Sequence, residues 1–216
     1  PNGPEEGKYK LHGQVLCERI HAMQILVATG NTHKLEEIRG ILQIPSWELV
    51  GLDQLQDPPE VDEDGDTFEA NAAKKARELA LFSGMWTLAD DSGLEVDALD
   101  GAPGVFSARF GGVHGDNAAN NARLLKELEG SPNRQARFRC VLALASPQGE
   151  IRCVSGAVAG TIAQALSGTH GFGYDPLFIP TGYEKTFAEL PASVKARISH
   201  RAEACKQAAQ AWSDLF

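Results

Sequence analysis

The chain has 216 residues, of which 43% are hydrophobic and 23% are charged, and its formal net charge is −9. These proportions are typical of a folded protein with one or two domains, and they exclude a mostly disordered chain. The negative charge argues against a nucleic-acid partner held by a basic surface, but it allows a small phosphorylated ligand whose charge is met locally.

Cysteine usage and hydropathy indicate the compartment. The four cysteines lie far apart and form neither a C-x-x-C pair nor a zinc pattern: Cys17, Cys140, Cys153 and Cys205. Widely spaced thiols in a chain of this length are typical of a reducing compartment. No run reaches the roughly 18 apolar residues that a membrane helix needs. We therefore expect a cytoplasmic protein with no membrane partner.

Residues 1–22 differ in composition from the rest of the chain. Their Lys and Arg residues balance their Glu residues, so the negative charge belongs entirely to the remainder. Met23 then opens a regular strand pattern. We expect residues 1–22 to be a leader, either native or artificial. We expect residues 23–216 to form a single domain, because no internal repeat or low-complexity linker divides them.

The first half of the chain predicts alternating strands and helices. Apolar, β-branched residues at 24–29 predict a buried strand, and apolar residues spaced three and four apart after Thr32 predict a helix. A second strand is predicted at 47–50. An acidic loop at 57–66 then leads into an alanine-rich helix at 67–82.

The middle of the chain predicts a strand, a further strand and a helix. Apolar residues at 86–89 predict a strand that ends at a pair of aspartates, and alternating residues at 94–99 predict another strand. Glycine- and proline-rich turns fill 100–115. Asp116 is a suitable N-cap for the helix that follows.

The last third predicts antiparallel strands and a closing helix. Long strands at 137–145 and 150–162 are joined by a Ser-Pro-Gln-Gly hairpin, and a short strand follows a glycine-rich loop at 167–176. The final helix is predicted from about 192 to 215, with a break near Ser199. Helices alternate with strands early in the chain and antiparallel strands come later, so the pattern predicts an α/β fold with a mixed β-sheet.

The turn Thr29-Gly30-Asn31-Thr32-His33-Lys34 is the first candidate site. A tight Gly-Asn turn exposes backbone N–H groups at a helix N-terminus, where the helix dipole favours an anion, and Lys34 adds a positive charge. The spacing is not that of a Walker A loop. The turn fits a bound phosphate, but taken alone it is more often a capped surface helix.

The acidic loop is the second candidate. It contains Asp62, Glu63 and Asp64, and Lys75 lies on the helix that follows. Carboxylate oxygens suit a hard cation such as Mg²⁺, which takes only one or two protein carboxylates besides water and substrate phosphate. A solvated acidic loop with a solvated lysine is the alternative interpretation.

Asp90 and Asp91 form the third candidate, with Ser92 and Gly93 directly after them. Two adjacent carboxylates at the end of a strand repel each other, so the pKa of one rises unless a cation or a donor lies between them. Asp, Ser and Gly are also common in turns. The local sequence leaves an ion site and a plain turn both open.

The fourth candidate combines two stretches near the C-terminus. In Gly171-Phe172-Gly173-Tyr174-Asp175-Pro176, an aromatic ring between glycines can serve as a flat platform for a base. Ser199-His200-Arg201, with Lys195 one turn earlier, offers several hydrogen-bond donors. A structured loop and a cationic helix face are the alternatives.

Six stretches occur in a fixed order along the chain. They are TGNTHK, the acidic loop followed by T-F-x-x-N-A-x-x-K-A, ADDSGL, GAPGVFSARF, GFGYDP and SHR. In this order they resemble the inosine triphosphate pyrophosphatase family, which removes non-standard purine nucleoside triphosphates such as ITP, dITP and XTP. The resemblance runs from about Ile25 to the C-terminal helix.

The resemblance implies both a fold and an activity. The fold is an elongated mixed β-sheet with flanking helices in two lobes, a substrate cleft between the lobes, and a homodimer. The activity is hydrolysis of ITP, dITP and XTP to the monophosphate and pyrophosphate, with Mg²⁺ as cofactor, which cleanses the nucleotide pool. Residues 23–216 would then be a single nucleotide pyrophosphatase domain.

The resemblance also assigns roles to residues. Asp91 matches the general base, and Lys34 and Lys75 match lysines that neutralise the leaving pyrophosphate. The metal contacts it implies are Asp62, Glu63, Asp90 and Asp91. The substrate contacts it implies are Thr29, Gly30, Asn31, Thr32, His33, Lys34, Ser92, Phe172, Gly173, Tyr174, Asp175, Lys195, His200 and Arg201. Donors near the last two would pair with the 6-carbonyl of hypoxanthine or xanthine and stay unpaired against the 6-amine of adenine.

One position departs from the family pattern T-F-x-E-N-A. Ala70 stands where that pattern has Glu, and we interpret the loss as structural, because Thr-x-x-Glu is a helix capping box. If that Glu instead supports the metal, the chain could be a nucleotide-binding sensor without hydrolysis. A Maf-like pyrophosphatase for modified pyrimidine triphosphates is the other alternative.

Overall fold

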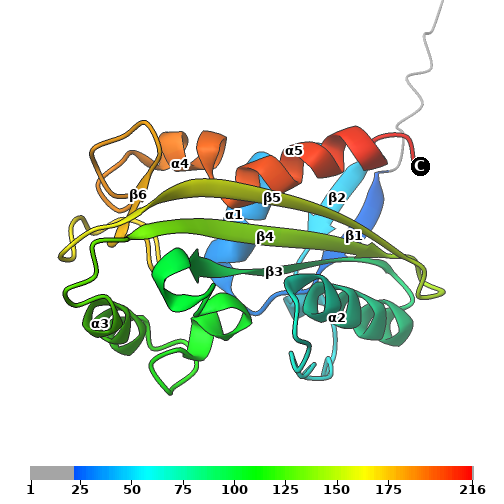
Figure 1. Ribbon diagram of the computed structural model, residues 1–216. Coiled ribbons are helices and arrows are strands. Elements are labelled where there is room, and N and C mark those ends of the chain that lie inside the picture. Colours follow the sequence, from blue (N-terminus) through cyan, green and yellow to red (C-terminus); the bar gives the residue numbers. More distant parts are fainter. Residues whose placement is uncertain (1–21, 216) are drawn as a thin grey trace, which may run out of the picture.

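A computed structural model describes residues 22–215 (Figure 1). A six-stranded sheet runs through the length of the molecule in the order β2-β1-β3-β4-β5-β6. Its strands are β1 (Met23–Val27), β2 (Trp47–Val50), β3 (Trp86–Val96), β4 (Gln135–Ala145), β5 (Ile151–Ile162) and β6 (Phe178–Pro180). β1 pairs in parallel with β2 and β3, whereas β3 to β6 pair antiparallel, so the predicted mixed sheet is confirmed.

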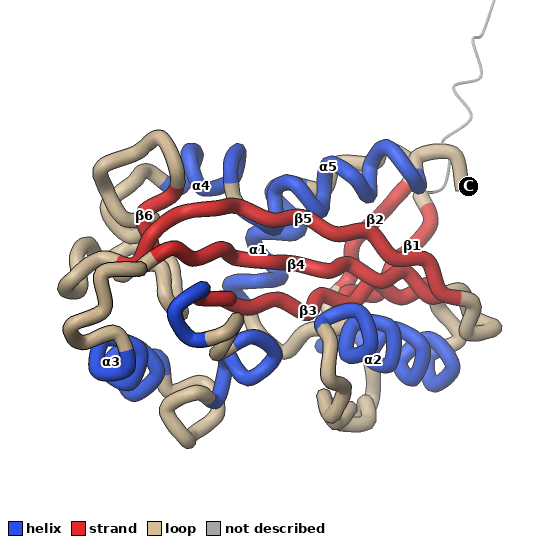
Figure 2. The backbone as a smooth tube through the Cα atoms, viewed as in Figure 1, coloured by secondary structure: helices blue, strands red, loops and turns tan. Residues whose placement is uncertain are grey.

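Helices cover both faces of this sheet (Figures 1 and 2). The α-helices are α1 (Thr32–Ile41), α2 (Phe68–Ser83), α3 (Asn117–Glu127), α4 (Ala192–Ile198) and α5 (His200–Trp212). Short 3₁₀ helices are η1 (Leu52–Gln54), η2 (Asp97–Leu99) and η3 (Gly104–Arg109). Figure 1 shows α1, α4 and α5 on one face, and α2, α3 and η3 on the other.

The alternation of side chains along β4 separates two parts of the core. Leu142 and Leu144 pack with α1 and α5, and Val141 and Ala143 pack with α2. Successive residues of a strand point to opposite faces, so each apolar run in β4 serves both layers of helices. This is why residues 140–145 of β4 form a continuous apolar stretch, whereas residues 135–139 alternate.

Several predicted boundaries are confirmed by their caps. Asp116 caps α3 by accepting a hydrogen bond from Ala119 N–H, and Ser199 ends α4 and caps α5 by accepting from Ala202 N–H. Thr67 caps α2 by accepting from Ala70 N–H at 3.1 Å. The predicted break in the last helix is therefore a side-chain cap between two helices.

The prediction that Asp90 and Asp91 lie at the end of a strand is wrong. β3 continues to Val96, and Asp90, Asp91, Ser92 and Gly93 all pair with β4. A side chain at position 93 would come within 2.4 Å of Ser107 Oγ, so the glycine permits close packing of η3 and does not form a turn. Residues 97–99, predicted as strand, form η2.

The strand that ends near the two aspartates is β1, the neighbour of β3. The parallel pairing of β1 with β3 stops at Val27 and Leu88, and the chain then turns into α1. Asp90 and Asp91 therefore lie on β3 just beyond the end of β1, with the N-terminus of α1 beside them. The edge of β3 at Asp90 and Asp91 is therefore not covered by β1.

Two predictions fall partly outside what the structure describes. The leader assigned to residues 1–22 lies outside the described residues except for Ala22, and the assignment of residues 23–216 to one domain stays a prediction. Among residues 22–215, no helix has both the length and the apolar character needed to cross a bilayer.

Candidate active site

The two aspartates point to opposite faces of the sheet. Asp90 pairs with Leu142, whose side chain packs under α1 and α5, and Asp91 pairs with Val141, whose side chain packs under α2. Strand alternation therefore separates the adjacent carboxylates, and each enters a different environment. The expected repulsion between them does not arise.

Asp90 is fully enclosed by donors. Its carboxylate pairs with Lys34 Nζ at 2.5 Å and Arg201 Nε at 3.0 Å, and it accepts hydrogen bonds from Ser92 Oγ and Cys140 Sγ, both at 3.0 Å. Burial alone would raise the pKa of Asp90, but the charges of Arg201 and Lys34 outweigh it and hold the pKa well below its usual range. Asp90 is a permanently ionised anchor for two cations.

Asp91 has one satisfied oxygen and one free oxygen. Oδ1 accepts the backbone N–H of Ser92 at 2.9 Å, whereas Oδ2 is buried and has no hydrogen-bond partner among residues 22–215. Burial and, less strongly, the charge of Glu63 raise the pKa of Asp91, whereas Lys34, Lys75 and the Asn71 side chain lower it, and the net result is a pKa of about 6. A buried carboxylate with a free oxygen and a pKa near neutrality is suited to accept a proton.

The acidic loop lies beside Asp91 because α2 holds it there. Glu63 forms an ion pair with Lys75, Asp64 lies 2.7 Å from Lys74 Nζ, and Gly65 N–H donates to Asn71 Oδ1 at 2.7 Å. Asp62 is exposed on the same loop. One turn of α2 thus fixes the loop in three places and presents Glu63 to Asp91.

The donor set fits a cation that arrives with phosphate. Within the described residues, no three His, Cys, Asp or Glu side chains converge as a ready-made metal site. The neighbouring carboxylates of Asp91 and Glu63 nevertheless fit the one or two protein carboxylates that Mg²⁺ accepts when substrate phosphates and water complete its shell.

Ion pairs of alternating charge run from Asp90 on β3 to Asp175 on the loop before β6. Arg201 continues from Asp90 to Glu37, and Lys195 then bridges Glu37 at 2.8 Å and Asp175 at 2.5 Å. Burial would raise the pKa of Glu37, but the charges of Arg201 and Lys195 lower it below its ordinary value. Arg201, Glu37 and Lys195 therefore each lie between two groups of opposite charge, and Asp175 ends this chain of charges.

Glu37 was not predicted from the sequence, although a signal was available. It lies three residues after Lys34 in α1, so both side chains project from the same side of the helix. Cys140 was also missed, because a thiol in an apolar strand indicates packing and nothing local shows that it donates to Asp90.

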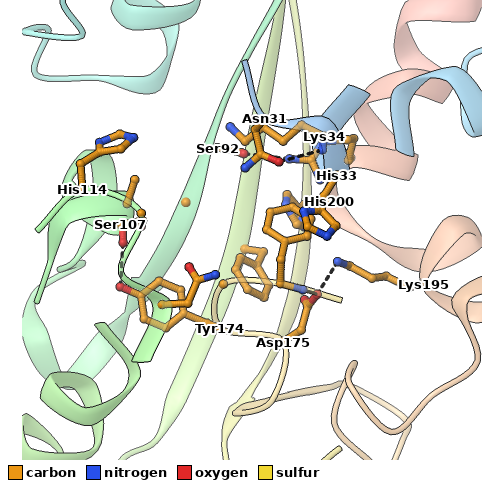
Figure 3. Close-up of a pocket in the computed structure, with 18 residues that line it drawn as sticks. Asn31, His33, Lys34, Ser92, Ser107, His114, Tyr174, Asp175, Lys195 and His200 are labelled. Carbon is orange, nitrogen blue, oxygen red and sulfur yellow. Dashed lines mark hydrogen bonds and ion pairs between the residues drawn. The ribbon is translucent and has the colours of Figure 1, made fainter. Parts of the chain in front are cut away.

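A pocket of about 190 Å³ opens next to this charge chain. Figure 3 shows Asn31, His33, Lys34, Lys195 and His200 on one side of it, and Ser107 and His114 on the other. Its lining includes these predicted substrate residues: Asn31, His33, Lys34, Ser92, Phe172, Gly173, Tyr174, Asp175, Lys195, His200 and Arg201. It also includes residues that the sequence did not suggest, among them Ser107, His114 and Asn117.

The ring of Phe172 forms one wall of the pocket. It stacks on His33 with 5.3 Å between ring centroids, and Lys195 Nζ lies 4.6 Å from its centroid. Asp175 accepts the backbone N–H of Phe172 at 2.8 Å, which fixes the loop that carries the ring. Contacts therefore fix both the ring of Phe172 and its backbone.

His200 is buried at the back of the pocket and is neutral. Burial, followed by the charges of Arg201 and Lys195, holds its pKa well below the usual range, and its ring stacks on Phe138 with centroids 4.7 Å apart. Nδ1 has no hydrogen-bond partner among residues 22–215. A neutral imidazole that lines the pocket can offer one donor or one acceptor to a ligand.

The remaining predicted residues lie outside the lining of the pocket. Asp91, Lys75 and Glu63 gather on the α2 face, and Asp62 is exposed next to Glu63. Thr29 and Gly30 lead into α1, and Thr32 is its first residue. Asp90 lies beneath the pocket with both oxygens engaged, and its predicted role as a metal ligand stays a prediction. The site thus has a pocket end and a carboxylate end, with α1 between them.

Comparison with known proteins identifies the family of the chain. The model of the Ham1 family matches residues 25–211. A dITP/XTP pyrophosphatase of Exiguobacterium sp. is 52% identical to this chain over 185 residues. The alignment covers 86% of this chain and 94% of that relative. The chain is 49% identical to a dITP/XTP pyrophosphatase of Desulforamulus reducens, with 90% of this chain and 98% of the relative covered.

Solved structures agree as well. A HAM1 protein from Coxiella burnetii is 36% identical, has a TM-score of 0.82 and covers 89% of this chain and 99% of its own. A Ham1 protein from Staphylococcus aureus is 38% identical, with a TM-score of 0.77 and coverage of 85% and 95%. The resemblance that the six ordered motifs predicted is confirmed, and the chain belongs to the Ham1 family.

Proposed function

We propose that this protein hydrolyses non-standard purine nucleoside triphosphates, namely ITP, dITP and XTP, to the monophosphate and pyrophosphate. The observation that carries the proposal is Asp91, a buried carboxyl with one free oxygen and a pKa of about 6, which lies near Lys34 and Lys75 and beside a pocket of about 190 Å³. Relatives about half identical to the chain are named dITP/XTP pyrophosphatases.

The phosphate end of the substrate fits the start of α1. Asn31 caps this helix by accepting Lys34 N–H at 3.2 Å, and the first N–H groups of the helix face an incoming anion together with the helix dipole. Lys34 and Lys75 are each held by a carboxylate, so both are pre-positioned to meet charge that develops on the leaving pyrophosphate.

Asp91 acts as the base in this proposal. Its free Oδ2 takes the proton from a water molecule that attacks the α-phosphorus, and the bond from that phosphorus to the bridging oxygen of the pyrophosphate breaks. Asp91 and Glu63 would hold Mg²⁺, with Asp62 within reach on the same loop. When bound, this ion offsets phosphate charge and makes water more acidic.

The base end fits the pocket between Phe172 and His200. Arg201 already uses three of its five N–H groups on Asp90, Glu37 and Ser92, so neutral His200 and the remaining Arg201 donors face the base. A 6-carbonyl would pair with such a donor, whereas the 6-amine of adenine would leave it unpaired, at a cost of about 1–3 kcal/mol per group.

One assay separates this function from its alternatives. The protein is incubated with Mg²⁺ and ITP, XTP, dUTP or ATP, and the phosphate product is identified. We expect pyrophosphate from ITP and XTP, with ATP cleaved about fivefold to 150-fold less efficiently, as a cost of about 1–3 kcal/mol for one unpaired buried donor implies. Preference for dUTP indicates a Maf-like enzyme, tight binding without turnover indicates a sensor, and release of orthophosphate contradicts the proposed bond.

Replacement of Ala70 by Glu tests the departure from the family pattern. The new carboxylate completes a capping box with Thr67, so we expect the free energy of unfolding to rise by about 0.5–1 kcal/mol and ITP turnover to stay within about twofold. Urea denaturation and steady-state kinetics measure the two effects. A several-fold rise in turnover together with tighter Mg²⁺ binding would mean that the missing Glu supports the metal.

We also propose a cytoplasmic location and a homodimer. The location is supported by the free thiols of Cys140, Cys153 and Cys205, which suit a reducing compartment. The homodimer is supported by the resemblance to the inosine triphosphate pyrophosphatase family. Analytical ultracentrifugation at micromolar concentration tests it directly, and a monomer there contradicts it.

A further inference from the structure

The motif GAPGVFSARF lies between the two ends of the site and touches both. At the pocket end, the backbone carbonyl of Ser107 accepts a hydrogen bond from Tyr174 Oη at 2.9 Å. At the carboxylate end, Arg109 Nη2 donates to the backbone carbonyl of Glu63 at 3.3 Å. Ser107 and Arg109 both belong to η3, which thus connects the loop that carries Tyr174 with the acidic loop.

Contacts that involve side chains fix the conformation of the acidic loop, residues 57–66. Within the described residues, no backbone-to-backbone hydrogen bond involves residues 57–66. α2 supplies three ties, to Glu63, Asp64 and Gly65, and Val61 packs against the core beneath α2. Arg109 adds a hydrogen bond from a different element. A loop fixed from one helix alone can pivot on it, and a contact from η3 removes that freedom.

The guanidinium of Arg109 is itself held in place. It lies over the ring of Phe106 with 5.0 Å between Cζ and the ring centroid, and it borders a depression of about 330 Å³ on the outer side of η3. A planar guanidinium stacked on a ring loses little further freedom when it donates a hydrogen bond. The contact with Glu63 is therefore pre-organised from the η3 side.

We propose that Arg109 is a positioning residue that fixes Glu63 opposite Asp91 by tying the acidic loop to η3. Its effect on turnover rests on the proposed function, because Glu63 matters there as a carboxylate beside the reacting phosphate. Its effect on the loop does not rest on that function, because the hydrogen bond is present without substrate.

The chain offers a closely matched control in Arg123. This arginine borders the same depression, lies 4.4 Å over the ring of Phe110, and donates to the carbonyl of Phe110 at 2.6 Å. Among residues 22–215, Arg123 forms no hydrogen bond or ion pair with the acidic loop. Arg123→Met therefore removes an arginine of the same kind from the same place without releasing Glu63.

The first measurement uses the nucleotide-free protein. Endoproteinase Glu-C cleaves after Glu60 and Glu63, and mass spectrometry identifies the cut. We expect Arg109→Met to raise the cleavage rate roughly fivefold to tenfold, because proteolysis follows the population of the opened loop. Arg109→Lys and Arg123→Met should stay within about twofold of wild type. An unchanged rate in Arg109→Met overturns the proposal.

The second measurement is kinetic. With ITP, we expect kcat of Arg109→Met to fall roughly tenfold with little change in KM, since a carboxylate displaced by a fraction of an ångström no longer meets the reacting group. A raised KM with unchanged cleavage indicates a direct phosphate contact, and faster cleavage with unchanged kcat shows that the position of Glu63 does not matter. Either result overturns the proposal. A wild-type protein inactive on ITP refutes the proposed function, and the cleavage rates still decide the role of Arg109.

Discussion

Replacement of Asp91 by Asn is expected to lower kcat for ITP by about 10²- to 10⁴-fold, which is the usual contribution of a positioned base. Asparagine keeps the shape and can still accept Ser92 N–H, but it cannot take a proton at the position of Oδ2. Pyrophosphate release with saturating ITP and Mg²⁺ measures the loss. Retention of more than about a tenth of the activity contradicts the role of Asp91 as base.

The fold of this variant should be intact, and this distinguishes a catalytic effect from a structural one. The ionised form of Asp91 is unfavourable in the native state, because burial and Glu63 raise its pKa to about 6. Asparagine removes that penalty, so the free energy of unfolding at pH 7.5 should rise by about 1–3 kcal/mol. A variant that is inactive and also less stable would leave misfolding as the cause of its inactivity.

The sequence predicted the elements whose signals are local. Asp116 and Ser199 mark helix starts because a short polar side chain before a helical pattern can accept a backbone N–H, and both caps are present. The hairpin between β4 and β5 was predicted for the same reason. Each of these features is decided within four or five residues of chain.

The strand through Asp90 and Asp91 could not be predicted in this way. Asp, Ser and Gly favour a turn in isolation, and the extended conformation is imposed by pairing with β4, about 50 residues later in the chain. A turn at Gly93 was one of the two open interpretations, whereas its role is to let η3 approach. Long-range pairing and close packing leave no trace in a short stretch of sequence.

The same contrast between local signals and distant contacts applies to the residues of the site. The residue types were predicted by the resemblance of six motifs, but the partners of each residue depend on contacts across the fold. Arg201 reaches Asp90 from 111 positions away. That contact changes the interpretation of Asp90, because a carboxylate engaged by Lys34 and Arg201 has less capacity left for a metal than its neighbour.

Replacement of Asp90 by Asn should have a different and opposite effect on stability. Asp90 is the shared partner of Lys34 and Arg201, and its loss leaves two buried cations facing a neutral amide. Removal of one member of a buried ion pair costs about 3–5 kcal/mol, so the free energy of unfolding at pH 7.5 should fall by that amount. Urea denaturation measures it, and a variant as stable as wild type contradicts the anchoring role.

The pH dependence of the two variants provides the sharper comparison. The native pKa of Asp90 is lowered, so its contribution to stability is full above its unfolded pKa of about 4 and is lost as the pH falls through the native value. The native pKa of Asp91 is raised to about 6, so ionised Asp91 destabilises the native state. This destabilisation is absent below about pH 4 and complete above about pH 6. Relative to wild type, Asp91→Asn should therefore gain stability between pH 4 and pH 6, whereas the deficit of Asp90→Asn should shrink only below about pH 4. Curves of the same sign for both variants would contradict the placement of the two carboxylates on opposite faces of β3.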